Sequence, residues 1–224
     1  MNKLFNILLF AVIAMMAASC AYDNYDEPGS LVTGKIVYNG QPLGVRGSSG
    51  EVYLQFWQYG WPNLTAINTY VGQDGTFSAL LFDGTYQLVM NSNRGPWVNS
   101  PDTVRVEVKG KTIVEYPVKP YFTISNPTYS LTGTTLTASF DVTEITAGRT
   151  IESVALMVNK TSFVDNSAEA HVNWVTEAGH TPGRINLTLN VSNNMNEVQL
   201  YARVGLKISG INQWLFDPNV KKIK

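Results

Sequence analysis

The sequence predicts an all-β protein made of two tandem antiparallel β-sandwich domains. After Cys20 no segment has a helical period, and short runs of alternating apolar and polar residues recur instead. Turn residues separate these runs, as at the two similar Asp-Gly-Thr-aromatic turns that begin at Asp74 and Asp83. Pro117 and Pro120 then interrupt the alternation, and we expect the boundary between the two domains there.

Residues 1–19 have the pattern of a bacterial export signal. Lys3 precedes an apolar run of about 15 residues, which is shorter than the roughly 18–20 residues that span a bilayer. The small residues before Cys20 resemble the lipobox of bacterial lipoproteins, although that pattern prefers Leu where this chain has Ala17. Cys20 is the only cysteine, so we expect cleavage before it and lipid on its thiol. The alternative is an ordinary secreted protein in which Cys20 is incidental.

Residues 20–30 are predicted to form an acidic tether, because they are polar and end in Pro28, Gly29 and a serine. Asp23, Asp26 and Glu27 also resemble the acidic tag that follows the cysteine in surface-exported Bacteroidetes lipoproteins. A solvated spacer that carries no such signal is the alternative.

The net charge and the composition exclude some classes of protein. The formal net charge is −1, and it becomes −2 when residues 1–19 are removed with Lys3. This near-balance gives no reason to expect a nucleic-acid partner. With Cys20 acylated no disulfide can form, so the fold must depend on apolar burial. A chain that is 44% hydrophobic and 11% aromatic can supply that burial.

The first domain is predicted to cover residues 31–119, with strands at about 31–38, 51–58, 76–82 and 85–90. Val104, Val106 and Val108 then alternate with polar residues before a turn at 109–111. The alternation continues through Val118, which predicts a hairpin with one side in the core and the other in water.

The second domain is predicted to cover residues 120–224 and to contain about seven strands, as an antiparallel sandwich does. Three of its strands alternate clearly. The residues expected to face the core are Leu136, Ala138, Phe140, Val142, Ile185, Leu187, Leu189, Val191, Val198, Leu200, Ala202, Val204 and Leu206. Gln199, Tyr201 and Arg203 are expected to face outward.

Several phrases of the sequence resemble known domains. Those at 31–37, 40–43, 73–77 and 82–86 look like the carboxypeptidase-regulatory, transthyretin-like sandwich. Other phrases, at 22–28, 102–104, 118–121 and 201–205, resemble a family of unknown function among Bacteroidetes surface lipoproteins. That resemblance covers nearly all of the mature chain. It implies a transthyretin-like domain followed by an Ig-like or fibronectin-like domain.

The resemblance also implies a cellular process. Members of that family are typically encoded beside starch-utilisation-type outer-membrane transporters and their sugar-binding lipoprotein partners. The expected location is therefore the cell-surface side of the outer membrane. The expected partners are the membrane, polysaccharide and components of the glycan transporter.

Motifs that carry catalysis are absent from the sequence. It has no Gly-x-Ser-x-Gly elbow, phosphate-binding loop or Gly-x-Gly-x-x-Gly. His171 and His180 lack the spacing of metal ligands. Glu51, Asp74, Asp83 and Asp102 could serve a glycosidase by residue type only. No enzymatic activity, catalytic residue, metal or cofactor is predicted.

An aromatic stretch from Tyr53 to Trp61 is the most suggestive feature for binding. If a strand starts at Val52, its alternate residues face the core, while Tyr53, Gln55, Trp57 and Tyr59 point the other way and Trp61 follows. An open row of rings suits the apolar faces of sugars, and nearby amides suit their hydroxyls. The alternative that we favour is that Trp57, Tyr59 and Trp61 pack between the two sandwiches; a third is contact with a partner protein.

Two further sites are predicted. Arg94 and Trp97 lie in a Gly-Pro loop and could reach the same rim as Trp61, although a tryptophan that covers the end of the core is a slightly better interpretation. The triplet Asp102-Thr103-Val104 resembles the O-glycosylation acceptor of Bacteroidetes envelope proteins, which makes Thr103 a candidate.

The expected function is that of a non-catalytic outer-membrane surface lipoprotein, accessory to polysaccharide capture and uptake, with weak glycan binding. The alternative is a structural, adhesion or protein-interaction spacer that binds no sugar. A sugar-binding protein needs exposed aromatic rings with amides within reach, whereas a spacer would bury Trp57, Tyr59 and Trp61.

Overall fold

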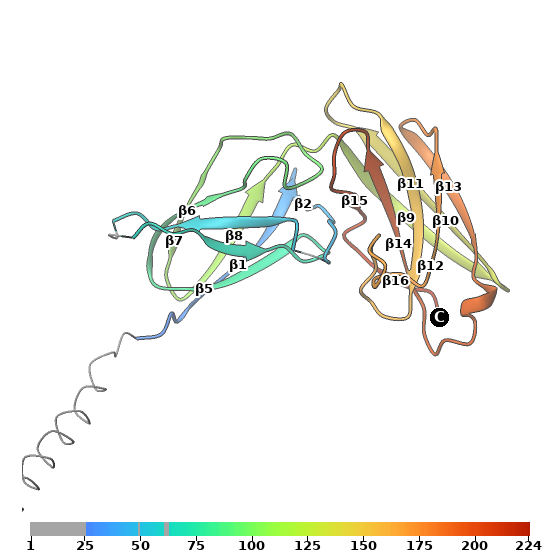
Figure 1. The fold of residues 1–224 in the computed structure, drawn as a ribbon, viewed down its shortest axis with the longest axis horizontal. Helices are drawn as coiled ribbons and strands as arrows, with labels where there is room; N and C mark the ends of the chain where they lie inside the picture. The colour runs from blue at the N-terminus through green and yellow to red at the C-terminus, as the bar shows by residue number, and fades with distance from the viewer. Residues whose placement is uncertain (1–25, 49, 61–62) are drawn as a thin grey trace, which may run out of the picture.

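The computed structural model describes residues 26–48, 50–60 and 63–224, which form two β-sandwiches side by side (Figure 1). The export signal, the lipidation site Cys20 and Trp61 lie outside the described residues. Within the described ranges, no helix has both the length and the apolar character that crossing a bilayer requires.

The first sandwich consists of two sheets of four strands. The β1 sheet contains β1 (Ser30–Tyr38), β2 (Gln41–Pro42), β5 (Thr76–Leu81) and β8 (Lys111–Pro117). The β3 sheet contains β4 (Ile67–Tyr70), β3 (Tyr53–Trp57), β6 (Gly84–Val89) and β7 (Val104–Val108), in that order. Large side chains such as Ile36, Phe56 and Tyr86 fill the core between the two sheets.

The last two strands of this sandwich do not form the predicted hairpin. β7 pairs with β6, whereas β8 pairs with β1, and the β1–β8 pair is parallel rather than antiparallel. The turn at Gly110 therefore carries the chain from one sheet to the other. The predicted faces are nevertheless correct, because Val106, Val108 and Val114 are all buried. Alternation determines which face of a strand is buried but does not determine its partner.

The second sandwich is built from antiparallel pairs only. One sheet contains β9 (Phe122–Thr132), β10 (Thr135–Glu144) and β13 (Gly183–Asn190). The other contains β11 (Ile151–Asn159), β12 (Asn173–Ala178), β14 (Tyr201–Ile208), β15 (Leu215–Phe216) and β16 (Lys221–Lys222). A short 3₁₀ helix, η2 (Ser192–Asn194), follows β13.

Most of the predicted core positions of this second domain are confirmed. Every predicted inward residue of the runs 136–142 and 185–191 is buried. The prediction for Val198 is wrong, because its side chain is 93% exposed. Val198 precedes the first residue of β14, Tyr201, so the alternation of the strand does not extend to it.

Arg203 lies on the predicted outer face of its sheet, but that face is covered and the side chain is fully buried, which the sequence did not predict. The 160–172 loop and the first domain cover its face of the sheet. Arg203 donates from Nε to the carbonyl of Asp217 (2.7 Å) and from Nη1 to that of Val164 (2.9 Å). It also donates to the carbonyls of Val45 and Gln73 in the first domain. A single buried cation thus joins the two sandwiches.

Further contacts make this junction tight. Asp165 accepts hydrogen bonds from the main-chain N–H (3.0 Å) and the hydroxyl (3.1 Å) of Ser48. The amide of Phe216 donates to the carbonyl of Gly44 (3.0 Å), where an added Cβ would lie 2.6 Å from the carbonyl oxygen of Phe216. The two backbones therefore approach each other as closely as a glycine allows.

Candidate functional site

The outer face of the β3 sheet combines aromatic rings with polar side chains. Strand alternation buries Val52, Leu54 and Phe56, as predicted, and turns the residues between them outward. The register places Tyr53 beside Tyr70, Gln55 beside Asn68, and Trp57 beside Gln87. We call these six residues the aromatic face: Tyr53, Gln55, Trp57, Asn68, Tyr70 and Gln87.

One end of the aromatic face is held by contacts between rings. Tyr53 and Tyr70 meet edge to face, with their centroids 5.9 Å apart. The guanidinium carbon of Arg94 lies 4.7 Å above the centroid of Tyr53, in the geometry of a cation–π contact. Gly50, which has a positive φ of 60°, lets its loop pack on the ring of Tyr70. The predicted proximity of Arg94 to Trp61 stays untested, because Trp61 lies outside the described residues.

The middle of the aromatic face is polar and offers donors and acceptors. The amide of Gln55 donates to Asn68 Oδ1 at 3.0 Å. Beyond Gln87, Arg105 pairs with Glu107 at 2.8 Å on β7. Thr85 also donates to Glu107, and this hydrogen bond, helped by Arg105, holds the pKa of the Glu107 carboxyl below its usual value. Glu107 therefore keeps its negative charge to a lower pH than an ordinary glutamate does.

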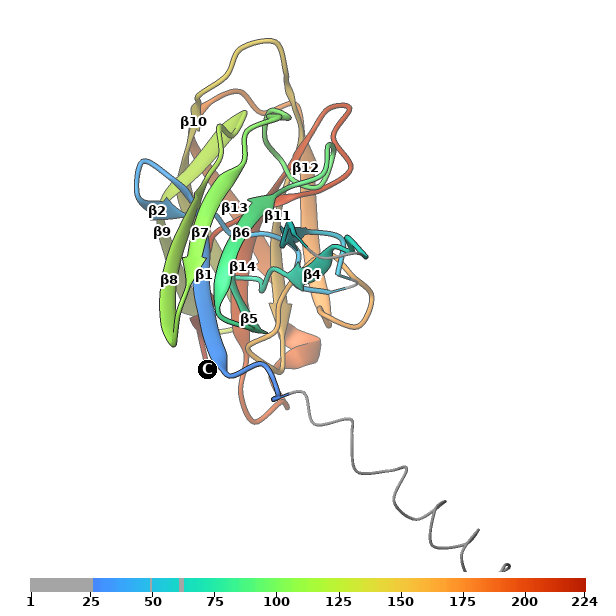
Figure 2. The ribbon, with the colours of Figure 1, turned by 90° about the vertical axis from the view of Figure 1, so that its left-hand side faces the viewer.

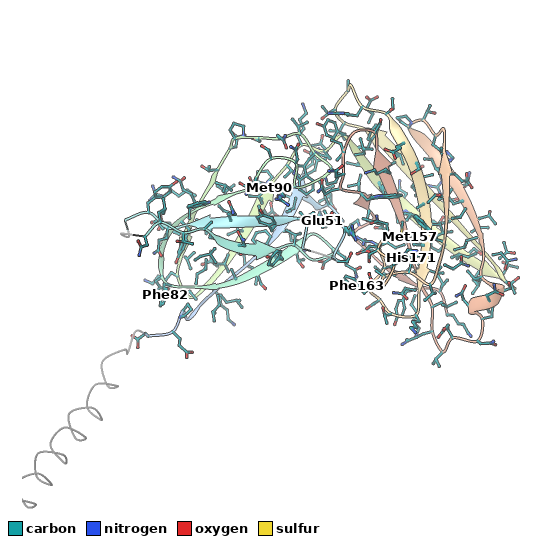
Figure 3. All side chains as sticks on the ribbon, in the orientation of Figure 1. Glu51, Phe82, Met90, Met157, Phe163 and His171 are labelled. Atoms are coloured by element: carbon teal, nitrogen blue, oxygen red, sulfur yellow. The ribbon has the colours of Figure 1, made fainter. Side chains whose placement is uncertain are left out.

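Trp57 and Tyr59, at the other end of the aromatic stretch, are not covered by the second domain. The prediction that these two rings pack between the two sandwiches is therefore wrong. The Tyr59 side chain is 60% exposed and Trp57 is half-buried. In Figure 3, Glu51 lies beside the second domain and Phe82 marks the opposite end of the first sandwich. Because β3 follows Glu51, it leads away from the junction.

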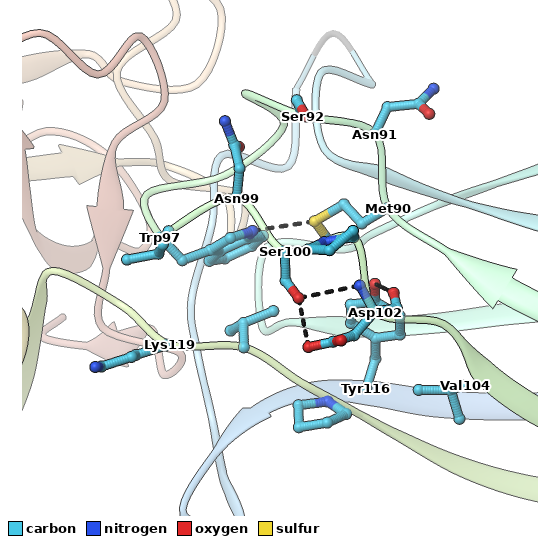
Figure 4. A pocket seen from close by; sticks show the side chains of 14 residues that line it. Met90, Asn91, Ser92, Trp97, Asn99, Ser100, Asp102, Val104, Tyr116 and Lys119 are labelled. Carbon is cyan, nitrogen blue, oxygen red and sulfur yellow. Dashed lines mark hydrogen bonds between the residues drawn. The ribbon is translucent and has the colours of Figure 1, made fainter.

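The Trp97 side chain is buried rather than displayed on an open rim, and its predicted proximity to Trp61 stays untested because Trp61 lies outside the described residues. Its side chain is only 5% exposed, and its indole N–H contacts the sulfur of Met90 at 3.1 Å (Figure 4). A Cβ on Gly95 would lie 1.9 Å from the indole, so the ring folds back beneath its own loop. The alternative interpretation, a tryptophan that covers the end of the core, agrees with this geometry.

A pocket of about 470 Å³ lies beside Trp97, and no sequence motif predicted it. Its apolar wall includes Met90, Trp97 and Tyr116 (Figure 4). Its polar rim includes Ser100 and Asp102, which hydrogen-bond to each other. The volume falls within the range of small-molecule sites. The linear sequence gives no signal for this pocket, because its walls come from two segments that only the fold brings together.

The other predicted residues occupy separate places. Thr103 is exposed, as the alternation predicts, and its glycosylation stays a prediction. His171 lies near Trp174 with ring centroids 5.0 Å apart, while His180 contacts Glu177. Among the residues that the structure describes, no group of three or more His, Cys, Asp or Glu is placed to hold a metal ion.

The four carboxylates considered for hydrolysis are held in separate local interactions. Glu51 pairs with Arg46 at 3.2 Å, and Asp74 accepts hydrogen bonds from Thr76 in its own turn. Asp83 accepts the hydroxyl of Ser30, and Asp102 accepts that of Ser100.

Comparison with known proteins identifies the relatives of this chain. The model of the N-terminal domain of a protein of unknown function (DUF3823) matches residues 30–119. The model of a domain of unknown function (DUF3823_C) matches residues 122–221. No curated protein matches the chain.

Three solved structures share the fold over most of the chain. A DUF3823 family protein from Parabacteroides merdae is 40% identical, with a TM-score of 0.83, over 89% of this chain and 100% of its own. A DUF3823 family protein from Bacteroides ovatus is 28% identical, with a TM-score of 0.78, over 88% of this chain and 98% of its own. A "putative carbohydrate binding protein" from Bacteroides uniformis is 18% identical, with a TM-score of 0.69, over 88% of this chain and 99% of its own. At that identity the likeness shows the fold alone.

Proposed function

Since this chain belongs to the DUF3823 family of proteins of unknown function, we propose that it is a non-catalytic, lipid-anchored protein that binds carbohydrate at the bacterial surface. Cys20 would carry the lipid, and the outer membrane would be the site of attachment. The protein would capture polysaccharide for the uptake machinery of the same membrane, including a glycan transporter.

The aromatic face is the observation that carries this proposal. Trp57 and the exposed Tyr70 offer apolar ring surface for the C–H faces of sugars, and Gln55, Asn68 and Gln87 offer hydrogen bonds for hydroxyl groups. Tyr53 and Trp57 lie four residues apart on one strand, a separation of about 13 Å. The face therefore suits an extended oligosaccharide better than a single sugar.

Two other considerations support the proposal. The relative from Bacteroides uniformis that is named for carbohydrate binding has the same two-domain fold, although it shares only 18% of the aligned residues. A lipid anchor would also hold the protein close to other anchored components, so that weak binding to a polysaccharide suffices for capture.

The second candidate function is that of a rigid spacer without sugar binding. The junction around Arg203 favours it, because hydrogen bonds from one buried guanidinium to both domains oppose their relative motion. A spacer needs this junction but has no use for exposed rings on the aromatic face.

Titration with polysaccharides separates the two functions. A soluble form that starts at Ala21 contains every strand, and we expect it to bind at least one cell-wall or plant polysaccharide in isothermal calorimetry. Trp57→Ala should weaken this binding about tenfold or more, which corresponds to about 1.4 kcal/mol. Trp174→Ala is the matched control, because Trp174 is 41% exposed on the second domain and should leave affinity unchanged. Failure of the unsubstituted protein to bind any glycan would favour the spacer.

Mass spectrometry of the native protein tests the anchor and the modification. We expect a mature chain that begins at an acylated Cys20, and a sugar mass on the peptide that contains Thr103. An unmodified thiol at the processed end, or an intact Met1, would refute the anchor.

A further inference from the structure

The β1 sheet has an exposed apolar patch on its outer face, on the opposite side of the first sandwich from Tyr53 and Trp57. The patch consists of Leu31, Leu80, Phe82 and Ile113, whose side chains are 39%, 57%, 45% and 85% exposed. Leu31 pairs with Leu80 across the β1–β5 ladder, and Ile113 lies on β8, on the other side of β1. The outer face of a sheet that meets only water normally carries polar residues, so four exposed apolar side chains on one such face indicate a contact surface.

This patch lies where the chain joins the fold. β1 begins at Ser30, one residue before Leu31. The hydroxyl of Ser30 donates to Asp83 and accepts the N–H of Gly110 at 2.7 Å, so the turns after β5 and β7 lie beside the start of β1. Figure 2 shows the start of β1 at the end of the first sandwich, close to β5.

The distance to the expected lipid is short. Ser30 lies ten positions after Cys20, and even a fully extended chain of ten residue steps spans no more than about 36 Å. A lipid on Cys20 therefore keeps Ser30 within that distance of the bilayer, and with it the end of the sandwich that carries the patch. Because the anchor confines the protein, the patch meets the bilayer at a higher effective concentration than any other apolar surface.

Two of the charged residues beside the patch are lysines, which suit a lipid interface. Lys109 and Lys111 are exposed at the same end of the sandwich, and Lys111 lies directly opposite Leu31 in the register. Lysine side chains beside an apolar surface can bury their stems and keep the ammonium group among lipid headgroups. The next outward row contains Ile113 beside Thr33 and Ser78, and the row after it, Lys35 opposite Glu115, ends the apolar character of the face.

We propose that the apolar patch rests on the bilayer that holds Cys20, and that this contact turns the aromatic face away from the membrane. The inference rests on the lipid anchor of the proposed function. The outer faces of the two sheets point in opposite directions, because the sheets are the two layers of one sandwich. The docked protein thus presents Tyr53 and Trp57 to material outside the cell. An acyl anchor and the apolar patch together give two membrane contacts on one molecule.

The test uses Cys20 itself. Because Cys20 is the only cysteine, the chain 20–224 can be coupled through its thiol to maleimide-bearing lipid in phosphatidylethanolamine–phosphatidylglycerol vesicles. The coupling supplies a membrane anchor even if Cys20 is not acylated in the cell. A tryptophan is then placed in the patch by Ile113→Trp, and its quenching by lipids with brominated acyl chains is measured relative to the unsubstituted protein. Val198→Trp, at a 93% exposed position of the second domain, is the matched control.

We expect Ile113→Trp to add at least twofold more quenchable fluorescence than Val198→Trp. The further changes Leu80→Ser and Phe82→Ser, made together in the Ile113→Trp protein, should remove that excess. Equal quenching of the two probes would overturn the docking. A dimer of the uncoupled protein that dissociates on Ile113→Ser would also overturn it, because the patch would then be an interface between two copies.

The two proposals can fail separately. Glycan titration of the coupled vesicles reports on the aromatic face, and quenching reports on the patch. Sugar binding without excess quenching would overturn the docking and leave the proposed binding function intact. Excess quenching without sugar binding would support the docking and overturn the glycan function.

Discussion

The guanidinium of Arg203 donates a hydrogen bond to the main-chain carbonyl of Gln73, which lies in the other sandwich. The same group donates to the carbonyls of Val45 and Val164 at 3.2 and 2.9 Å and packs on the ring of Phe216. Burial lowers the pKa of Arg203 to about 10, against the opposing effect of Asp217 and Asp165, so the group is charged at neutral pH. The orientation of the aromatic face relative to the second domain depends on this contact.

Replacement of Arg203 by alanine should destabilise the protein strongly. It removes donors from four carbonyls, of which that of Gln73 keeps the N–H of Val45 (3.1 Å), and each polar group left buried and unpaired costs about 1–3 kcal/mol. We expect the free energy of unfolding to fall by about 3 kcal/mol or more in urea denaturation. The control Arg184→Ala removes an exposed ion pair with Asp141 and should change it by less than about 1 kcal/mol. Equal effects of the two substitutions would contradict the role assigned to Arg203.

Asp165 makes the junction sensitive to acid. Burial raises the pKa of its carboxyl, but hydrogen bonds from Ser167 and Ser48 outweigh burial and hold the pKa below its ordinary value. A carboxyl whose pKa is lower in the folded state contributes stability above its unfolded pKa of about 3.9, and that contribution is lost as pH falls through the folded pKa. Asp165→Asn removes an acceptor of the Ser48 N–H and should cost about 1–3 kcal/mol at pH 7.

The difference in unfolding free energy between the unsubstituted protein and Asp165→Asn should therefore shrink below about pH 4. Urea denaturation of both proteins at pH 7 and at pH 3 measures this change. A difference that stays constant between the two pH values would show that ionised Asp165 is not the stabilising form.

Sequence patterns predicted the faces of strands well where only one domain was involved. The alternation from Leu136 to Val142 and from Ile185 to Val191 predicted which residues are buried, because each strand packs against its own core. The same alternation placed Arg203 on the outer face but did not predict that it is buried. The polar side of β14 is covered by the 160–172 loop and the first domain, and alternation within one strand carries no information about what covers its second face.

Strand partners and the candidate site show a similar limit. The sequence around Gly110 predicted a turn correctly but did not distinguish a hairpin from a connection between two sheets, since both bury Val108 and Val114. The aromatic row was visible in the sequence. Tyr70 and Asn68, which complete the aromatic face, became visible only through the register between β3 and β4.

Gly44 should tolerate no side chain, because an added Cβ would lie within 2.7 Å of the backbone of Phe216 and Asp217. Backbone atoms cannot move aside as a flexible side chain can, so Gly44→Ala should cost about 1–3 kcal/mol as overpacking. Gly29→Ala is the control, since no atom lies within 4 Å of its added Cβ, and its effect should stay within about 0.5 kcal/mol. Thermal unfolding of the two variants compares these costs. Equal melting temperatures would show that the backbone at the junction shifts to accommodate a side chain at residue 44.

Arg94 should matter for sugar binding more than for folding. Its guanidinium lies over Tyr53 at a half-buried position, and a cation–π contact at such a site contributes about 0.5–1 kcal/mol. Arg94→Gln should therefore lower the free energy of unfolding by no more than about 1 kcal/mol. It should weaken glycan binding several-fold, because the loss of Arg94 leaves the ring of Tyr53 unsupported and removes a donor beside the aromatic face.

Arg149→Gln is the matched control for this substitution, because Arg149 makes a comparable contact with Tyr121, at 5.6 Å, away from the aromatic face. Calorimetric titration of both variants with the polysaccharide that the unsubstituted protein binds gives the comparison. We expect reduced affinity for Arg94→Gln alone. Unchanged affinity in Arg94→Gln would remove the Tyr53 end of the aromatic face from the binding site and leave Trp57 as its centre.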